Sequence, residues 1–145
     1  MVKLDTVKHT ALKLIGACGF SFSLYCLTNL GMVISFKNTL PITNQVQLEQ
    51  LLDLEEDKLN CHLSISIKFG DEKKGTAEAR IYPDRTYDIT LYRERTIGAL
   101  RHELYHICGG HLDDIINTNQ ILRTFKSVFY YEPTANLYAT FDLKL

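Results

Sequence analysis

The chain has 145 residues, of which 46% are hydrophobic and 23% are charged. This length gives room for one domain with a modest core. The 16 basic and 17 acidic residues nearly cancel, and the net charge of −1 gives no electrostatic case for binding nucleic acid, which usually requires a clustered basic surface.

The N-terminal hydrophobic segment covers residues 1–36. Residues 14–36 carry no charge and follow three lysines, and a helix of about 20 mainly apolar residues can cross a bilayer. Three interpretations compete: a membrane anchor, a cleaved signal, and a buried soluble helix or hairpin. We favour membrane association through residues 14–36, with the protein anchored or exported and a cytoplasmic location as the alternative.

The four cysteines include no Cys-x-x-Cys pair, which argues against a zinc knuckle or a thioredoxin-like motif. Two of them, Cys61 and Cys108, lie outside the hydrophobic segment. They could form one disulfide, but two buried free thiols are the favoured expectation because cysteine packs well as a small apolar residue. The cysteines do not decide the compartment.

Residues 37–92 are predicted to form a linker, a helix and three strands. Residues 37–44 are the expected linker, and apolar residues at helical spacing predict a helix over 45–59. Strict alternation of apolar and polar residues over 63–69 then predicts a half-buried strand, and 76–82 and 87–92 are expected to form two more. Gly-flanked and Pro-containing turns separate the strands.

Helical spacing returns in the last third of the chain. We expect one helix from Thr96 to Ile107, ended by Gly109 and Gly110, a second over 113–129, and a third beginning at Glu132. The order of helix, three strands and three helices predicts an α+β domain over residues 45–145.

The predicted helix over 96–107 contains the sequence His-Glu-Leu-Tyr-His at residues 102–106. Residues four apart share one helix face, so His102 and His106 can bind one cation. Glu103 would project beside them, where a carboxylate can accept a proton from zinc-activated water. The pattern therefore predicts a Zn2+ site with Glu103 as the general base. The competing interpretation is a solvated helix that happens to carry two histidines.

A third ligand must come from further along the chain. Candidates close in sequence are His111 and Asp113, because the two glycines could bend the chain back. The favoured candidate is Glu132, which has Asn136 four residues later on the predicted helix. Asn136 would then support a ligating imidazole through a hydrogen bond.

These residues resemble the gluzincin metallopeptidases, in particular the minigluzincins and the ImmA/IrrE-like proteases, which combine H-E-x-x-H with a later E-x-x-A-N pattern. The resemblance covers roughly residues 45–145. It implies a small zincin-like domain, with His102, His106 and Glu132 as ligands and Glu103 as the catalytic acid and base. It also implies hydrolysis of a peptide or protein substrate that pairs with the sheet edge.

Stabilisation of the transition state requires a further donor, which is worth about 3 kcal/mol in comparable enzymes. The candidates are His111 and Tyr138, together with Tyr105 and Tyr131. A different class of function also fits the sequence: a membrane-tethered binding or regulatory module whose metal site is structural or vestigial.

Overall fold

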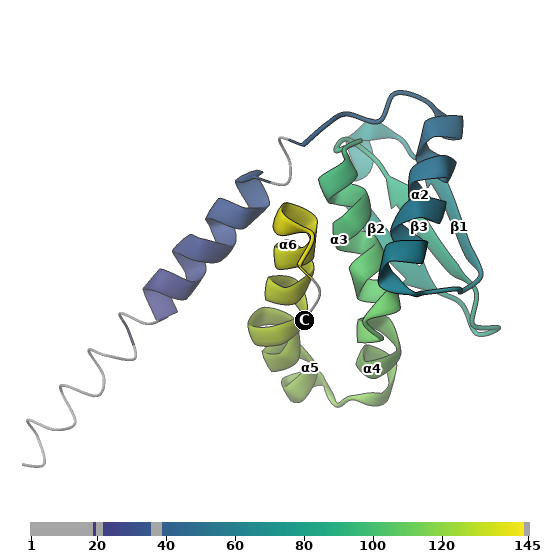
Figure 1. Cartoon of the computed structure of the whole chain (residues 1–145). Coiled ribbons are helices and arrows are strands. Elements are labelled where there is room, and N and C mark those ends of the chain that lie inside the picture. Colours follow the sequence, from purple (N-terminus) through teal and green to yellow (C-terminus); the bar gives the residue numbers. More distant parts are fainter. Residues whose placement is uncertain (1–18, 20–21, 36–38, 144–145) are drawn as a thin grey trace, which may run out of the picture. The chain divides into compact units, whose positions relative to one another are not determined.

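A computed structural model describes residues 19, 22–35 and 39–143 (Figure 1). The chain divides into two compact units, Met1–Gly31 and Met32–Leu145. Residues 19 and 22–35 are helical, and the other residues of the stretch over 14–36 lie outside the described residues. Among the residues that the structure describes, no helix combines the length and the apolar character that crossing a membrane requires.

The segment expected to be a linker belongs to the folded unit from residue 39 onward. Pro41 forms a β-bridge with Thr96, and Ile42 is only 3% exposed. The side chain of Thr39 accepts a hydrogen bond from the backbone N–H of Gly98. Backbone pairing and burial of Ile42 therefore hold residues 39–44 against the start of the helix that begins at Ile97.

Helix α2 spans Gln45–Leu59, with the bounds that the sequence predicted. Asn44 caps its N-terminus by accepting a hydrogen bond from the backbone N–H of Gln47. Asn60 ends the helix in the left-handed conformation, with φ of 52°.

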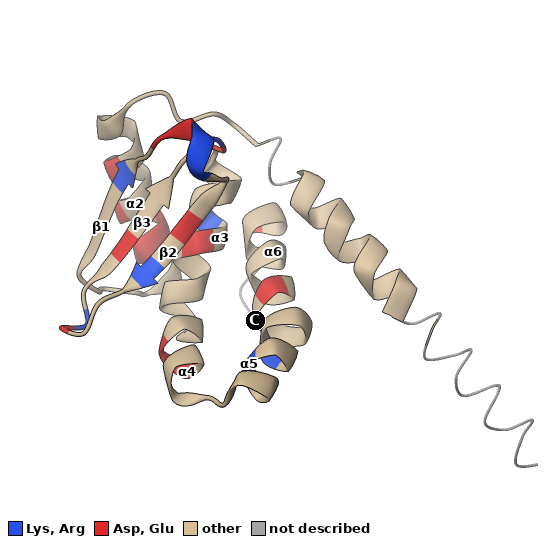
Figure 2. Cartoon of the chain, turned by 180° about the vertical axis from the view of Figure 1, so that it is seen from behind, with Lys and Arg blue, Asp and Glu red and all other residues tan. Residues whose placement is uncertain are grey.

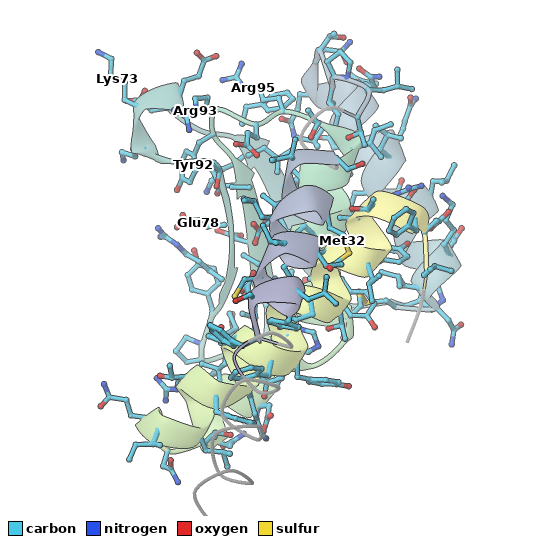
Figure 3. The ribbon with its side chains drawn as sticks, turned by 90° about the vertical axis from the view of Figure 1, so that its left-hand side faces the viewer. Met32, Lys73, Glu78, Tyr92, Arg93 and Arg95 are labelled. Carbon is cyan, nitrogen blue, oxygen red and sulfur yellow. A yellow bond between two sulfur atoms is a disulfide. The ribbon has the colours of Figure 1, made fainter. Side chains whose placement is uncertain are left out.

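The sheet contains β1 (Ile65–Phe69), β2 (Ala77–Ile81) and β3 (Tyr87–Leu91) in the order β1-β3-β2. The central strand β3 runs parallel to β1 and antiparallel to β2. Because β3 is central, β2 is an edge strand. A short 3₁₀ turn, η1 (Glu72–Lys74), lies between β1 and β2. Figure 3 shows Lys73 on this turn, projecting away from the sheet.

One face of the sheet is apolar and the other is polar. The odd-numbered strand residues, including Ile67 and Ile89, face the helices, and α2 packs on β1 while α3 (Ile97–Cys108) packs on β2 and β3. The outer face carries interspersed acidic and basic residues (Figure 2). There the hydroxyl of Tyr92 donates to Glu78, and both side chains are labelled in Figure 3. This alternation is what the period-two pattern predicted.

The C-terminal helices are α4 (His111–Asn117), α5 (Gln120–Lys126), the π-helical turn η2 (Ser127–Tyr131) and α6 (Glu132–Phe141). The single helix predicted over 113–129 is thus interrupted. Thr118 adopts an extended conformation, and Asn119 caps the new helix through the backbone N–H of Leu122. Asparagine favours such caps over helix interiors, which explains the break.

Cys61 and Cys108 form a disulfide, so the favoured expectation of two free thiols is wrong. The bond joins the segment after α2 to the last residue of α3. The cysteines meet because α2 and α3 pack side by side on the same sheet face. The α+β class is confirmed, and so is a helix followed by three strands; the described residues then form four helices, α3 to α6, in place of the three predicted.

Candidate metal centre

Helix α3 brings the two histidines of the motif together. Thr96 caps the helix by accepting a hydrogen bond from the backbone N–H of Ala99 at 3.2 Å. His102 and His106 follow one turn apart, and their Nε2 atoms lie 3.1 Å from each other. The rings are nearly perpendicular, at 83°. Two ring nitrogens therefore converge on one point beside the helix.

The third group comes from α6, which packs along α3 (Figures 1 and 2). Glu132 is the first residue of α6, and Pro133 follows it at a position where proline fits the first helical turn. One carboxylate oxygen of Glu132 lies 3.4 Å from Nε2 of His102, and the other lies 3.6 Å from Nε2 of His106. His102, His106 and Glu132 thus form a possible metal-binding triad, with ligand atoms within 4.8 Å of one another.

The two imidazole nitrogens are close enough to share one cation. Bonds of about 2.0–2.1 Å at tetrahedral angles separate neighbouring ligand atoms by about 3.3 Å. The two Nε2 atoms lie 3.1 Å apart, and a different carboxylate oxygen of Glu132 faces each of them, at 3.4 and 3.6 Å. Imidazole nitrogens with one carboxylate also leave a coordination position for water or substrate.

The electrostatics favour the protonation states that bind a cation. Burial, together with the neighbouring His102, lowers the pKa of His106 to about 3. Burial by itself raises the pKa of Glu132, but the hydrogen bond to His102 and the adjacent histidines outweigh burial and lower it. At neutral pH His106 is therefore neutral and Glu132 is ionised, which are the ligand forms of these side chains.

Glu103 lies between α3 and the edge strand β2. Its carboxylate accepts a hydrogen bond from the backbone N–H of Ala79, and burial raises its pKa to about 7. A cleft of about 180 Å3 opens beside it, with walls that include Ala77, His102 and Glu132. A carboxylate with this pKa in a cleft next to a cation site is suited to accept and return a proton near neutral pH.

His111 does not join the triad and is not exposed. The side chain is 3% exposed, and its Nδ1 lies 3.0 Å from Nδ1 of His106, on the side of that ring away from the ligand atoms. Its ring stacks on Tyr131 at 4.4 Å. The expectation that His111 stabilises a transition state is therefore not supported, because the ring lies behind His106. Asp113 is also outside the triad, since it binds Arg85 and Tyr87.

The tyrosines considered as oxyanion donors are engaged elsewhere. The hydroxyl of Tyr138 donates to Glu55 at 2.8 Å, and the residue is 2% exposed. Tyr131 donates to Asp114 and is equally buried. Tyr105 is 5% exposed and packs against the ring of Tyr138. The structure thus corrects the expectation for Tyr138: its hydroxyl belongs to an interior network.

Asn136 lines the cleft and is 3% exposed. Its Oδ1 atom has no hydrogen-bond partner among the described residues. The expected hydrogen bond from Asn136 to a ligating imidazole therefore stays a prediction. This buried amide oxygen lines the same cleft as His102, and it could accept a hydrogen bond from a bound substrate or water.

Glu55 is the functional neighbour that the sequence analysis missed. It is 1% exposed, and it accepts hydrogen bonds from Lys58, Arg101 and Tyr138. One signal was available: Glu55 follows Leu48 and Leu52 at helical spacing, so it lies on the apolar face of α2. The network joins α2 to both helices of the triad.

Comparison with known proteins identifies no relative: no family model, no curated protein and no solved structure matches the chain.

Proposed function

We propose that this protein is a zinc-dependent peptidase in which His102, His106 and Glu132 hold the metal and Glu103 handles the proton. The observation that carries the proposal is that two Nε2 atoms from α3 converge with the Glu132 carboxylate from α6. A second carboxylate, that of Glu103, lines the same cleft. A solvated helix that carried two histidines by chance would not need Glu132 at 3.4–3.6 Å from both rings.

Zinc bound at the triad would supply a Lewis acid for the scissile carbonyl and would lower the pKa of water. The protein supplies the remaining steps. Glu103 accepts a proton from the attacking water and holds it on its carboxylate while the C–O bond forms. As the C–N bond breaks, Glu103 passes this proton to the leaving amine nitrogen. The hydrogen bond from Ala79 keeps the carboxylate aimed into the cleft.

The substrate is proposed to be an extended peptide that pairs with the outer edge of β2. The backbone N–H of Tyr82 donates to the carbonyl of Thr86, and that of Tyr92 donates to the carbonyl of Thr76. The backbone N–H and C=O groups of the even-numbered residues of β2 therefore face β3. Because peptide groups alternate along a strand, the N–H and C=O of Ala77 and the C=O of Ala79 face away from β3. Ala77 also lines the cleft. An added strand there would carry its peptide bonds past Glu103.

The test is metal content and hydrolysis measured on the same preparations of the full chain. Wild type is expected to bind one zinc and to cleave an unfolded protein substrate. Glu132→Ala should lose zinc, whereas Glu103→Gln should keep zinc and lose hydrolysis. Glu49→Gln, an exposed carboxylate on α2, is the control and should change neither property.

The outcomes separate the two classes of function. Wild type that binds no zinc after reconstitution would refute the metal site. Zinc binding that depends on Glu132 without any hydrolysis would favour a binding or regulatory module with a structural metal. Hydrolysis that persists in a clean Glu103→Gln preparation would refute the role of Glu103.

A further inference from the structure

We infer that His111 is a positioning residue: it accepts a hydrogen bond from Nδ1 of His106 and thereby holds the other nitrogen of that ring toward the metal. The inference rests on the proposed metal site. It assigns a role to a buried histidine that the proposed hydrolysis does not use directly.

The direction of the hydrogen bond follows from the geometry. The two Nδ1 atoms lie 3.0 Å apart, so one must donate and the other must accept. Nε2 of His106 converges with Nε2 of His102 and with Glu132, and a nitrogen that binds a metal carries no proton. The proton of a neutral His106 is then on Nδ1. His111 must accept it and must carry its own proton on Nε2.

The His111 ring is held firmly enough to orient its neighbour. It stacks on Tyr131 with an angle of 25° between the rings. Tyr131 is itself fixed, because its hydroxyl donates to Asp114, which also pairs with Lys126 at 2.6 Å. An acceptor that is buried and clamped in this way restricts rotation of the His106 ring.

Two glycines allow the chain to return His111 to His106. Gly110 has φ of +70°, a conformation that residues with a Cβ rarely adopt. A Cβ on Gly109 would lie 2.8 Å from the carbonyl oxygen of Tyr105 and 3.0 Å from Nε2 of His111. The Gly109–Gly110 turn therefore has a second function beyond ending α3: it gives the His111 ring its place.

The test is the zinc affinity of the full chain, measured by competition with a chelator. His111→Phe keeps an aromatic ring on Tyr131 but removes the acceptor, and it should weaken zinc binding by about 10- to 100-fold. His111→Gln, whose side-chain oxygen can accept the same hydrogen bond, should recover part of this loss. His62→Phe alters an exposed histidine and serves as the control with unchanged affinity.

A direct measurement covers the case in which a variant fails to fold. In zinc-loaded wild type, 15N NMR should show a proton on Nδ1 of His106 and a scalar coupling across the hydrogen bond to Nδ1 of His111. A proton on Nδ1 of His111 would overturn the inference, as would equal zinc affinity of wild type and folded His111→Phe. If wild type binds no zinc at all, both the proposed function and this inference fail. If wild type binds zinc, these results test the role of His111 alone.

Discussion

The hydroxyl of Tyr138 in α6 donates a 2.8 Å hydrogen bond to Glu55 in α2, across 83 residues of sequence. The same carboxylate accepts a hydrogen bond from Arg101 of α3 at 2.9 Å. Arg101 precedes His102, and Tyr138 lies six residues after Glu132 in α6. One buried carboxylate therefore links the two helices whose side chains form the metal-binding triad.

Glu55→Ala should strongly destabilise the fold. The substitution leaves Arg101 without its buried partner, and loss of one member of a buried ion pair typically costs about 3–5 kcal/mol. Urea denaturation of the metal-free protein measures the loss. Glu49→Ala, on the exposed side of the same helix, should change the free energy of unfolding by less than about 0.5 kcal/mol. Equal effects of the two substitutions would contradict a special role for Glu55.

Titration of Glu55 should also make the stability of the fold depend on pH. Burial raises the pKa of Glu55, but the hydrogen bonds from Arg101, Lys58 and Tyr138 outweigh burial, so the pKa is lowered from 4.5. The unfolded chain therefore binds the proton more readily, and the contribution of Glu55 is complete above pH 4.5 and is lost as the pH falls through the lowered pKa. Unfolding free energies of the metal-free protein between pH 7 and pH 3 (about the range in which carboxylates titrate) should show this decline.

Glu55→Gln is the control for that titration. The variant should be less stable than wild type at neutral pH, and the difference between the two should shrink as the solution becomes acidic. A constant difference across the range would mean that other carboxylates produce the decline.

Tyr138→Phe should affect stability and leave catalysis intact. Removal of the hydroxyl leaves one oxygen of Glu55 with an unmet hydrogen bond, which costs about 1–3 kcal/mol. Because the hydroxyl points at Glu55 and the side chain is buried, kcat for the folded variant should equal that of wild type. A loss of kcat at unchanged zinc content would return Tyr138 to the list of transition-state stabilisers.

The disulfide should contribute strongly to stability. Cys61 and Cys108 are separated by 47 residues, and closure of a loop of this length in the unfolded chain corresponds to about 4 kcal/mol. The double substitution of Cys61→Ser and Cys108→Ser should therefore lower Tm well below that of wild type. Cys26→Ser, which alters an exposed free thiol, should not. If both variants melted alike, the disulfide would carry little of the stability.

Local patterns were enough to predict the elements that depend on nearby residues. The bounds of α2 and the alternation of β1 follow from periods of 3.6 and 2, and these periods reflect backbone geometry alone. The break at Thr118 was missed because helical spacing continues across it. A polar cap there competes with the interior of a helix, and single-sequence periodicity does not measure that competition.

Burial of polar groups was harder to predict. His111 was considered only as a ligand or a transition-state donor and Glu55 was not considered, yet both are almost completely buried. A polar side chain is buried only where distant elements supply hydrogen-bond partners. For Glu55 these partners include Arg101 and Tyr138, and for His111 the partner is His106.

The sequence by itself determined the pairing of His102 with His106, because residues four apart on one helix share a face whatever surrounds them. It also placed Glu103 next to His102 on the same helical turn, because the two residues are adjacent in the chain. Only the tertiary structure decided that Glu132 meets both histidines, that His111 lies behind His106, and that Cys61 bonds to Cys108. Those contacts depend on how α2, α3 and α6 pack, and packing is a property of the whole core rather than of any local pattern.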